Sequence, residues 1–153
     1  MMKKFLFIFS LMLISTASFA QQGTTTWGAH FDYFLDTPNN PGIGVSIGHE
    51  FVDNVRGVAE FDYLFKNKGA SGWNINVNAE YLFSIQNILT VYPIAGMNVL
   101  GWSGDESTSK LGLNLGGGIE YPVSNNIILK AEFMYKTQWN GYSTINVGFI
   151  LPL

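Results

Sequence analysis

The clearest pattern in the chain is the alternation of apolar and polar residues between Trp73 and Phe83. Odd-numbered positions carry apolar or aromatic side chains, and even-numbered positions carry asparagine or glutamate, with Leu82 as the exception. Successive side chains of a β-strand point to opposite faces, so the segment predicts a strand with one apolar and one polar face. At about 3.4 Å per residue and a tilt of about 40°, it rises roughly 25–30 Å, the height of the apolar band of an outer-membrane barrel.

The same alternation recurs along the chain, and turn-forming residues bound each repeat. The predicted strands are 25–35, 42–52, 56–65, 73–83, 88–100, 111–121, 127–136 and 144–151. Pro93 lacks a ladder N–H, so pairing in its strand is expected to begin near it or to contain a bulge. Connections near Asp53, Ser84 and Ser124 are expected to be short and to face the periplasm. Longer loops, expected to face the exterior, are predicted near Pro38, Lys68, Asp105 and Asn140, with residues 101–110 the longest.

Eight antiparallel strands are an even number that can close on itself, and closure removes the sheet edges that lipid does not tolerate. The predicted fold class is therefore all-β, an eight-stranded antiparallel up-and-down transmembrane β-barrel. Composition favours the same fold, because charged residues make up only 12% of the chain, about half of the usual share in soluble domains. An exterior that faces water is hard to build from such a sequence.

The N-terminus is typical of an export signal. Lys3 and Lys4 precede an apolar run from 5 to 14, and Ser18 to Ala20 supply small residues for cleavage. The alternative, a membrane-anchoring helix, requires about 20 apolar residues, and this run is shorter. We therefore expect residues 1–20 to be a cleaved signal peptide and residues 21–153 to form one outer-membrane barrel domain. The chain has no cysteine, which excludes disulfides and thiolate metal sites, and its net charge of −3 gives no basic surface for nucleic acid.

Two motifs carry a resemblance to a known family. Residues 92–96, Tyr-Pro-Ile-Ala-Gly, are followed by Asn98, and the chain ends with alternating apolar residues at 145, 147, 149, 151 and 153. The first is similar to a strand opening, and the second to the C-terminal assembly signal, of the small eight-stranded outer-membrane β-barrels of the OmpX and OmpA-transmembrane type. The family signal usually ends on Phe, whereas this chain ends on Leu153 after Pro152. The resemblance implies recognition by the outer-membrane assembly machinery.

Alternation alone does not say which face points inward. A secreted lipocalin-like barrel would place the apolar face inside, around a ligand. Aromatic residues at both ends of the apolar rows favour the opposite orientation, because transmembrane barrels carry aromatic girdles at both interfaces. The predicted girdle residues are Tyr33, Phe51, Tyr63, Phe65, Trp73, Tyr81, Phe83, Tyr121, Tyr135 and Phe149.

With the polar face inward, the charged residues form a predicted structural network in the lumen. Its members are Asp32, Glu50, Glu60, Asp62, Glu80, Glu120, Lys130, Glu132 and Lys136, with Arg56 and His30 on the same face. Hairpin geometry sets Glu120 opposite Lys130, which predicts an ion pair. It also brings Glu60 near Glu80 and Glu50, so a basic side chain, Lys130 first, should reach across, or one carboxyl should keep its proton. An interior of eight strands holds little more than side chains, which favours a plugged lumen over a path for ions or protons.

Enzymatic and ligand-binding motifs are weak in this sequence. Of the two histidines, His30 is assigned to the lumen and His49 to the apolar face, and neither occurs in the His-x-Ser pattern of lipid A deacylases. Residues 105–108, Asp-Glu-Ser-Thr, are expected to form a solvated loop rather than a divalent-cation site that bridges lipopolysaccharide. We expect no catalytic residues, cofactor or metal.

The prediction from sequence is a monomeric, non-enzymatic barrel of the outer membrane of a Gram-negative cell. Its expected role is structural or adhesive in the envelope, in contact with outer-membrane lipid and lipopolysaccharide and without nucleic acid. The alternatives are a narrow pore or carrier for a small or hydrophobic solute, a lipid A-modifying enzyme, and a secreted soluble ligand binder.

Overall fold

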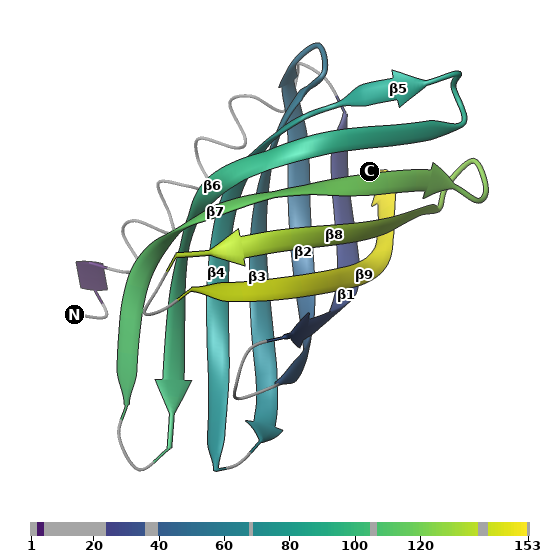
Figure 1. Ribbon diagram of the computed structural model, residues 1–153. Coiled ribbons are helices and arrows are strands. Elements are labelled where there is room, and N and C mark those ends of the chain that lie inside the picture. The colour runs from purple at the N-terminus through teal and green to yellow at the C-terminus, as the bar shows by residue number, and fades with distance from the viewer. Residues whose placement is uncertain are drawn as a thin grey trace.

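The computed structural model describes residues 3–4, 24–35, 40–67, 69–104, 107–137 and 141–152 of the 153-residue chain. From residue 24 onward these residues form strands joined by short connections (Figure 1). The strands are β1 (Thr25–Phe34), β2 (Pro41–Val52), β3 (Val55–Asn67), β4 (Ala70–Tyr81), β5 (Phe83–Ile85), β6 (Leu89–Ser103), β7 (Thr108–Pro122), β8 (Ile128–Lys136) and β9 (Tyr142–Pro152). Among the described residues, no helix is long and apolar enough to cross a membrane.

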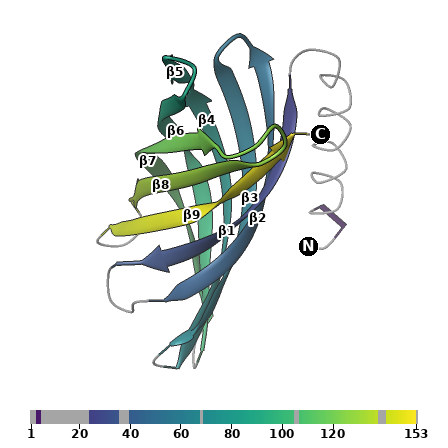
Figure 2. The same ribbon diagram turned by 90° about the vertical axis from the view of Figure 1, so that its right-hand side faces the viewer.

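The strands close into a barrel. Every neighbouring pair is antiparallel, β1 pairs with β9, and β4 pairs with β6, so the sheet has no free long edge within the described residues (Figures 1 and 2). The short strand β5 continues the course of β4, because both pair with β6 in one register, with Glu80 opposite Ile94 and Phe83 opposite Val91. The described residues therefore form a closed eight-stranded antiparallel barrel, which confirms the predicted fold class.

Pro93 affects the neighbouring strand rather than its own. Strand β6 runs through Pro93, which pairs with Gly117 of β7 in the register of the residues around it. On the other side, pairing with β4 stops at Ile94 and resumes with β5 at Val91. The missing N–H of proline explains the gap, since that residue cannot donate to a ladder. Leu82, the exception in the alternation, lies at this gap and donates its N–H to the carbonyl of Asn54 at 2.7 Å.

Two connections are shorter than the sequence predicts. Asn67 pairs with Ala70, which leaves only two residues between β3 and β4, and Gly69 takes a positive φ of 84° there. Strands β6 and β7 also extend into the predicted loop 101–110, where Trp102 pairs with Thr108. The prediction of longer loops at both places is wrong, because backbone pairing needs no apolar side chain and continues past the apolar band.

Several predicted segments lie outside the described residues. These are the export signal apart from Lys3 and Lys4, the loops near Pro38 and Asn140, and Asp105 and Glu106 of the acidic loop. They stay predictions.

The polar face of the sheet points into the barrel. In β1, Phe31 is 72% exposed on the outside, whereas its neighbours His30 and Asp32 are only 3% and 8% exposed inside. The lipocalin-like alternative requires the reverse orientation and is therefore wrong. Thr26 pairs with Pro152, so β1 begins and β9 ends at one end of the barrel, called here the terminal end; the opposite end is called the loop end.

The predicted girdle residues lie on the outer face, and most of them are between 37% and 51% exposed. Strand register divides them into two groups of five. Toward the loop end lie Tyr33, Tyr63, Phe65, Trp73 and Tyr135, and toward the terminal end lie Phe51, Tyr81, Phe83, Tyr121 and Phe149. Rings also pair along strands, with centroids 5.7 Å apart for Tyr63 and Phe65. This placement is what two interfacial girdles require.

Candidate functional site: the polar lumen

The lumen gathers ionisable side chains from β1, β3, β4, β7 and β8. Alternation accounts for this, because most inward positions in these strands are flanked by outward apolar residues. The described charged groups inside are His30, Asp32, Arg56, Glu60, Asp62, Glu80, Glu120, Lys130, Glu132 and Lys136, none more than 8% exposed. Six carboxyl groups thus face one arginine, two lysines and one histidine in a space shielded from water.

Glu50 differs from the other predicted lumen residues. It is only half-buried, and the ladder between β2 and β3 is irregular between Glu50 and Val52. Its register partner is Arg56, whose guanidinium points to carboxylates of other strands. Glu50 therefore lies beside the network at the terminal end rather than within it.

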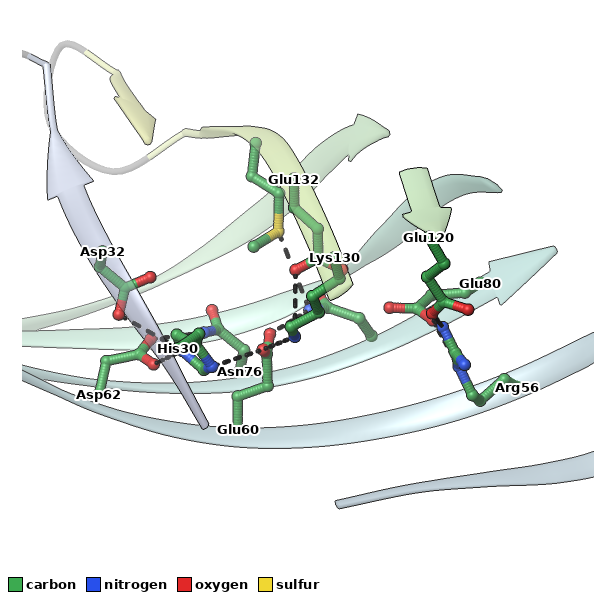
Figure 3. A network of polar contacts seen from close by, with 12 residues as sticks. His30, Asp32, Arg56, Glu60, Asp62, Asn76, Glu80, Glu120, Lys130 and Glu132 are labelled. Atoms are coloured by element: carbon green, nitrogen blue, oxygen red, sulfur yellow. Dashed lines mark hydrogen bonds and ion pairs between the residues drawn. The ribbon is translucent and has the colours of Figure 1, made fainter. Parts of the chain in front are cut away.

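Arg56 is the cation at the terminal end of the network. Its Nε donates to Glu80 Oε2 at 2.7 Å, and its Nη2 lies 2.6 Å from the same oxygen. Nη2 also donates to Glu120 Oε1 (Figure 3). The guanidinium stands 5.4 Å from the ring centroid of Tyr92. Arg56 thus joins β3, β4 and β7 through two buried carboxylates, a geometry suited to the planar guanidinium.

Lys130 occupies the middle of the lumen. Its Nζ lies 3.5 Å from Glu60 Oε2 and 3.6 Å from Glu132 Oε1. Glu132 also accepts a hydrogen bond from the Tyr92 hydroxyl at 2.8 Å. The predicted register is correct, since Glu120 is the Cα partner of Lys130, but Glu120 takes Arg56 as its ion-pair partner while Lys130 reaches across to Glu60.

The predicted approach of Glu60 to Glu80 does not follow from the observed register. Glu60 is opposite Asn76, and Glu80 is opposite Arg56, four residues further along β4. The two-residue connection between β3 and β4 causes this shift, because the longer loop assumed from the sequence would place the strands in another register. Each carboxylate therefore has its own basic partner, Lys130 for Glu60 and Arg56 for Glu80.

Asparagine amides fill much of the remaining lumen. Asn114 donates to Asn78 Oδ1 at 2.8 Å and accepts from Asn98 at 2.6 Å. Lys136 Nζ donates to Asn76 Oδ1 at 2.8 Å and to Asn114 Oδ1 at 3.2 Å. Amides both donate and accept, so they connect the charged groups without adding charge.

Apolar side chains also point inward, which the sequence reasoning did not predict. At the loop end Phe34, Leu64 and Leu100 form a buried cluster against Trp102 and Tyr142, called here the apolar cap. A second cluster, formed by Tyr92, Ile94 and Met134, lies further from the loop end. These residues lie at positions of the alternation that point inward and are polar elsewhere in the same strand. In β3, for example, Leu64 lies two residues after the inward Asp62. Position in the alternation was therefore the signal that could have identified them.

A small cavity lies toward the terminal end. It is lined by Thr26, Ser46 and Gly48 and by charged groups of the network, including Arg56 and Lys130. At the same end, on the outer face, His49 Nδ1 and Thr25 Oγ1 are 2.7 Å apart. The two histidines are thus separated, with His30 inside the barrel and His49 outside, as the alternation predicts.

No family model matches this sequence, and no curated protein matches it. Solved structures do match. The N-terminal barrel domain of Pseudomonas aeruginosa OprF has a TM-score of 0.72 at 19% identity, covering 86% of this chain and 98% of that one. Neisserial surface protein A has a TM-score of 0.66 at 16% identity, covering 85% and 95%. Ail, the attachment invasion locus protein of Yersinia pestis, has a TM-score of 0.59 at 18% identity, covering 86% and 99%. The chain therefore has the fold of the small eight-stranded outer-membrane β-barrels.

Proposed function

We propose that the chain is an integral outer-membrane β-barrel whose lumen is plugged by side chains and whose role is structural or surface-interacting rather than catalytic. The observation that carries the proposal is the network of buried polar groups between facing walls of the barrel, which lies beneath the apolar cap. Lys130 of β8 contacts Glu60 of β3, and Arg56 of β3 contacts Glu120 of β7.

The outer face supports residence in a membrane. Val45, Phe31, Leu113 and Leu115 are more than half exposed in the middle of their strands, and a wide apolar surface of this kind is costly in water. The proposed partners are accordingly outer-membrane lipid and lipopolysaccharide, with the assembly machinery engaged during insertion. Export by a signal peptide in residues 1–20 and a monomeric state belong to the same proposal.

The names of two matched proteins support the surface-interacting part of the proposal. One is named a surface protein and another an attachment invasion locus protein. Outer-membrane barrels carry their longer connections on the exterior side, and the proposal assigns the loop end of this chain to that side. Because the connections after Asn67 and Ser103 are short, general envelope support is the better fit than a dedicated adhesin.

Planar-bilayer conductance of the refolded mature chain tests the proposal. A gel that shows heat-dependent migration would establish that the barrel is folded, and we expect no resolved channels from that sample. Stable channels that change in Glu60→Gln, but not in Glu50→Gln outside the network, would instead show a narrow pore and overturn the plugged lumen.

The lipid-modifying alternative is tested separately. Incubation of the refolded chain with lipopolysaccharide should leave lipid A unchanged by mass spectrometry. Turnover that disappears in His30→Gln or Asp32→Asn would contradict the non-enzymatic role.

A further inference from the structure

A histidine and two aspartates meet inside the barrel near the apolar cap. His30 and Asp32 come from β1 and Asp62 from β3, and each is at least nine-tenths buried. One ligand atom from each lies within 4.8 Å of the others. His30 Nε2 is 2.7 Å from Asp62 Oδ1 and 3.4 Å from Asp32 Oδ2 (Figure 3).

The space between these side chains depends on a glycine. Strand β2 lies between β1 and β3, and its residue opposite both His30 and Asp62 is Gly44. A Cβ atom at position 44 would overlap His30 Nε2 and Asp62 Oδ1. Strand β2 therefore contributes no side chain at this place. The imidazole of His30 and the carboxylate of Asp62 meet above Gly44.

Two polar atoms of the group are unsatisfied. Asp32 Oδ2 and His30 Nδ1 are buried and have no hydrogen-bond partner among the residues that the structure describes. A buried carboxylate oxygen without a donor is costly. Asp62, in contrast, is held in place, because its Oδ2 accepts from the amides of Asn74 and Asn76 at 2.9 Å each. Such outer contacts orient a ligating carboxylate and leave Oδ1 directed at the histidine.

Charge in the lumen favours a cation here. The six carboxyl groups exceed Arg56, Lys130 and Lys136 by three. Arg56 and Lys130 have their closest carboxylates in Glu80, Glu120, Glu60 and Glu132, and Lys136 donates to amides. Among the described residues, His30 is the basic group within ion-pair distance of the two aspartates, at 3.4 Å from Asp32 and 2.7 Å from Asp62.

We propose that His30, Asp32 and Asp62 form a site for a divalent transition-metal ion of the Zn²⁺ type. One imidazole nitrogen and two carboxylate oxygens are a donor set that suits Zn²⁺ better than Ca²⁺ or Mg²⁺, which take oxygen ligands. Tetrahedral ligands at Zn²⁺ distances stand about 3.3 Å apart. The His30–Asp32 separation already matches that value, and the His30–Asp62 separation needs to open by about half an ångström. Binding of the ion releases to solvent the proton that His30 Nε2 and Asp62 Oδ1 share, and it leaves a fourth position for water.

Metal titration of the refolded, untagged mature chain tests this site. Isothermal titration with Zn²⁺ should show one ion per chain, and Co²⁺ should give the visible absorption of a low-coordinate nitrogen and oxygen site. His30→Gln, Asp32→Asn and Asp62→Asn should each weaken Zn²⁺ binding about a hundredfold or more, since they remove a ligand rather than an outer contact. Heat-dependent migration on a gel checks that each variant is folded.

His49→Gln and Glu50→Gln are the matched controls, because they change the other histidine and a carboxylate outside the network. Both should bind Zn²⁺ like the wild type. Absence of Zn²⁺ binding by the folded wild type would show that His30 serves only as a cation between two carboxylates and would overturn the proposal. Binding that persists in His30→Gln, or that is lost in His49→Gln, would also overturn it. If a ligand variant fails to fold, the Co²⁺ spectrum of the wild type still decides whether nitrogen and carboxylate ligands hold the ion.

Discussion

Replacing Arg56 by methionine should destabilise the barrel strongly, because two buried carboxylates share this cation. Arg56, Glu80 and Glu120 are 5%, 3% and 6% exposed, so bulk water has little access to the carboxylates left behind. Its two bonds to Glu80 are 2.7 and 2.6 Å long, and a third goes to Glu120. Breaking a buried ion pair by removing one partner costs about 3–5 kcal/mol. We expect a loss in that range in the free energy of unfolding of Arg56→Met.

Reversible urea unfolding in lipid vesicles, followed by tryptophan fluorescence, measures this loss. The four tryptophans of the chain supply the signal. Lys66→Met is the matched control, since Lys66 is an exposed cation on the same strand. The control should change the free energy of unfolding by no more than about 0.5 kcal/mol, as usual for surface substitutions.

Neutralising the partners separates lost charge compensation from lost packing. In the triple variant Arg56→Met, Glu80→Gln, Glu120→Gln the two carboxylates that Arg56 compensated are neutral as well, and replacing a whole buried ion pair is often close to neutral. We expect it to recover most of the loss. The reasoning is refuted if Arg56→Met is as stable as the Lys66→Met control, or if the triple variant is no more stable than the single one.

Two further substitution pairs test the lumen and the outer face. Gly44→Ala should cost about 1–3 kcal/mol in unfolding free energy because its Cβ would overlap His30 and Asp62, whereas Gly117→Ala should be tolerated because the nearest atom to its Cβ lies at 3.5 Å; equal losses in urea unfolding would refute this. Val45→Arg, in the middle of β2 and 58% exposed, should cost about 2–4 kcal/mol in vesicles, while Val52→Arg at the end of β2 should cost only about 0–1 kcal/mol. Equal costs for the two valine variants would contradict a lipid-facing band centred on Val45.

The fold could be predicted from sequence because side-chain alternation is a local property. The segment from Trp73 to Phe83 shows both the strand and its two faces, and even its exception, Leu82, marks the break between β4 and β5. The orientation of the faces followed from where the aromatic residues lie. The predicted loops at Lys68 and Asp105 were wrong because strand pairing continues where the apolar pattern has ended.

The contacts inside the lumen could be predicted only in part, because they depend on register and on side chains that cross the barrel. Residues on one hairpin, such as Glu120 and Lys130, were placed correctly opposite one another. The partner of each depends on strands far away in sequence, since Glu120 lies 64 residues from Arg56 and Lys130 lies 70 from Glu60. Tyr92 contacts Arg56 through its ring and Glu132 through its hydroxyl. It was not predicted as a lumen residue because it lies in an apolar motif, although its position in the alternation places it inside.

The central claim is a barrel with lipid on its apolar face and a closed, polar interior, and NMR in lipid bilayer nanodiscs tests both parts in one sample. The methyl groups of Val45 should show cross-peaks to lipid acyl chains. The side-chain amides of Asn76 and Asn114, which are 1% and 2% exposed, should exchange slowly with water. Fast exchange of these amides would show a water-filled lumen, and Val45 methyls in contact with water instead of lipid would contradict the membrane barrel itself.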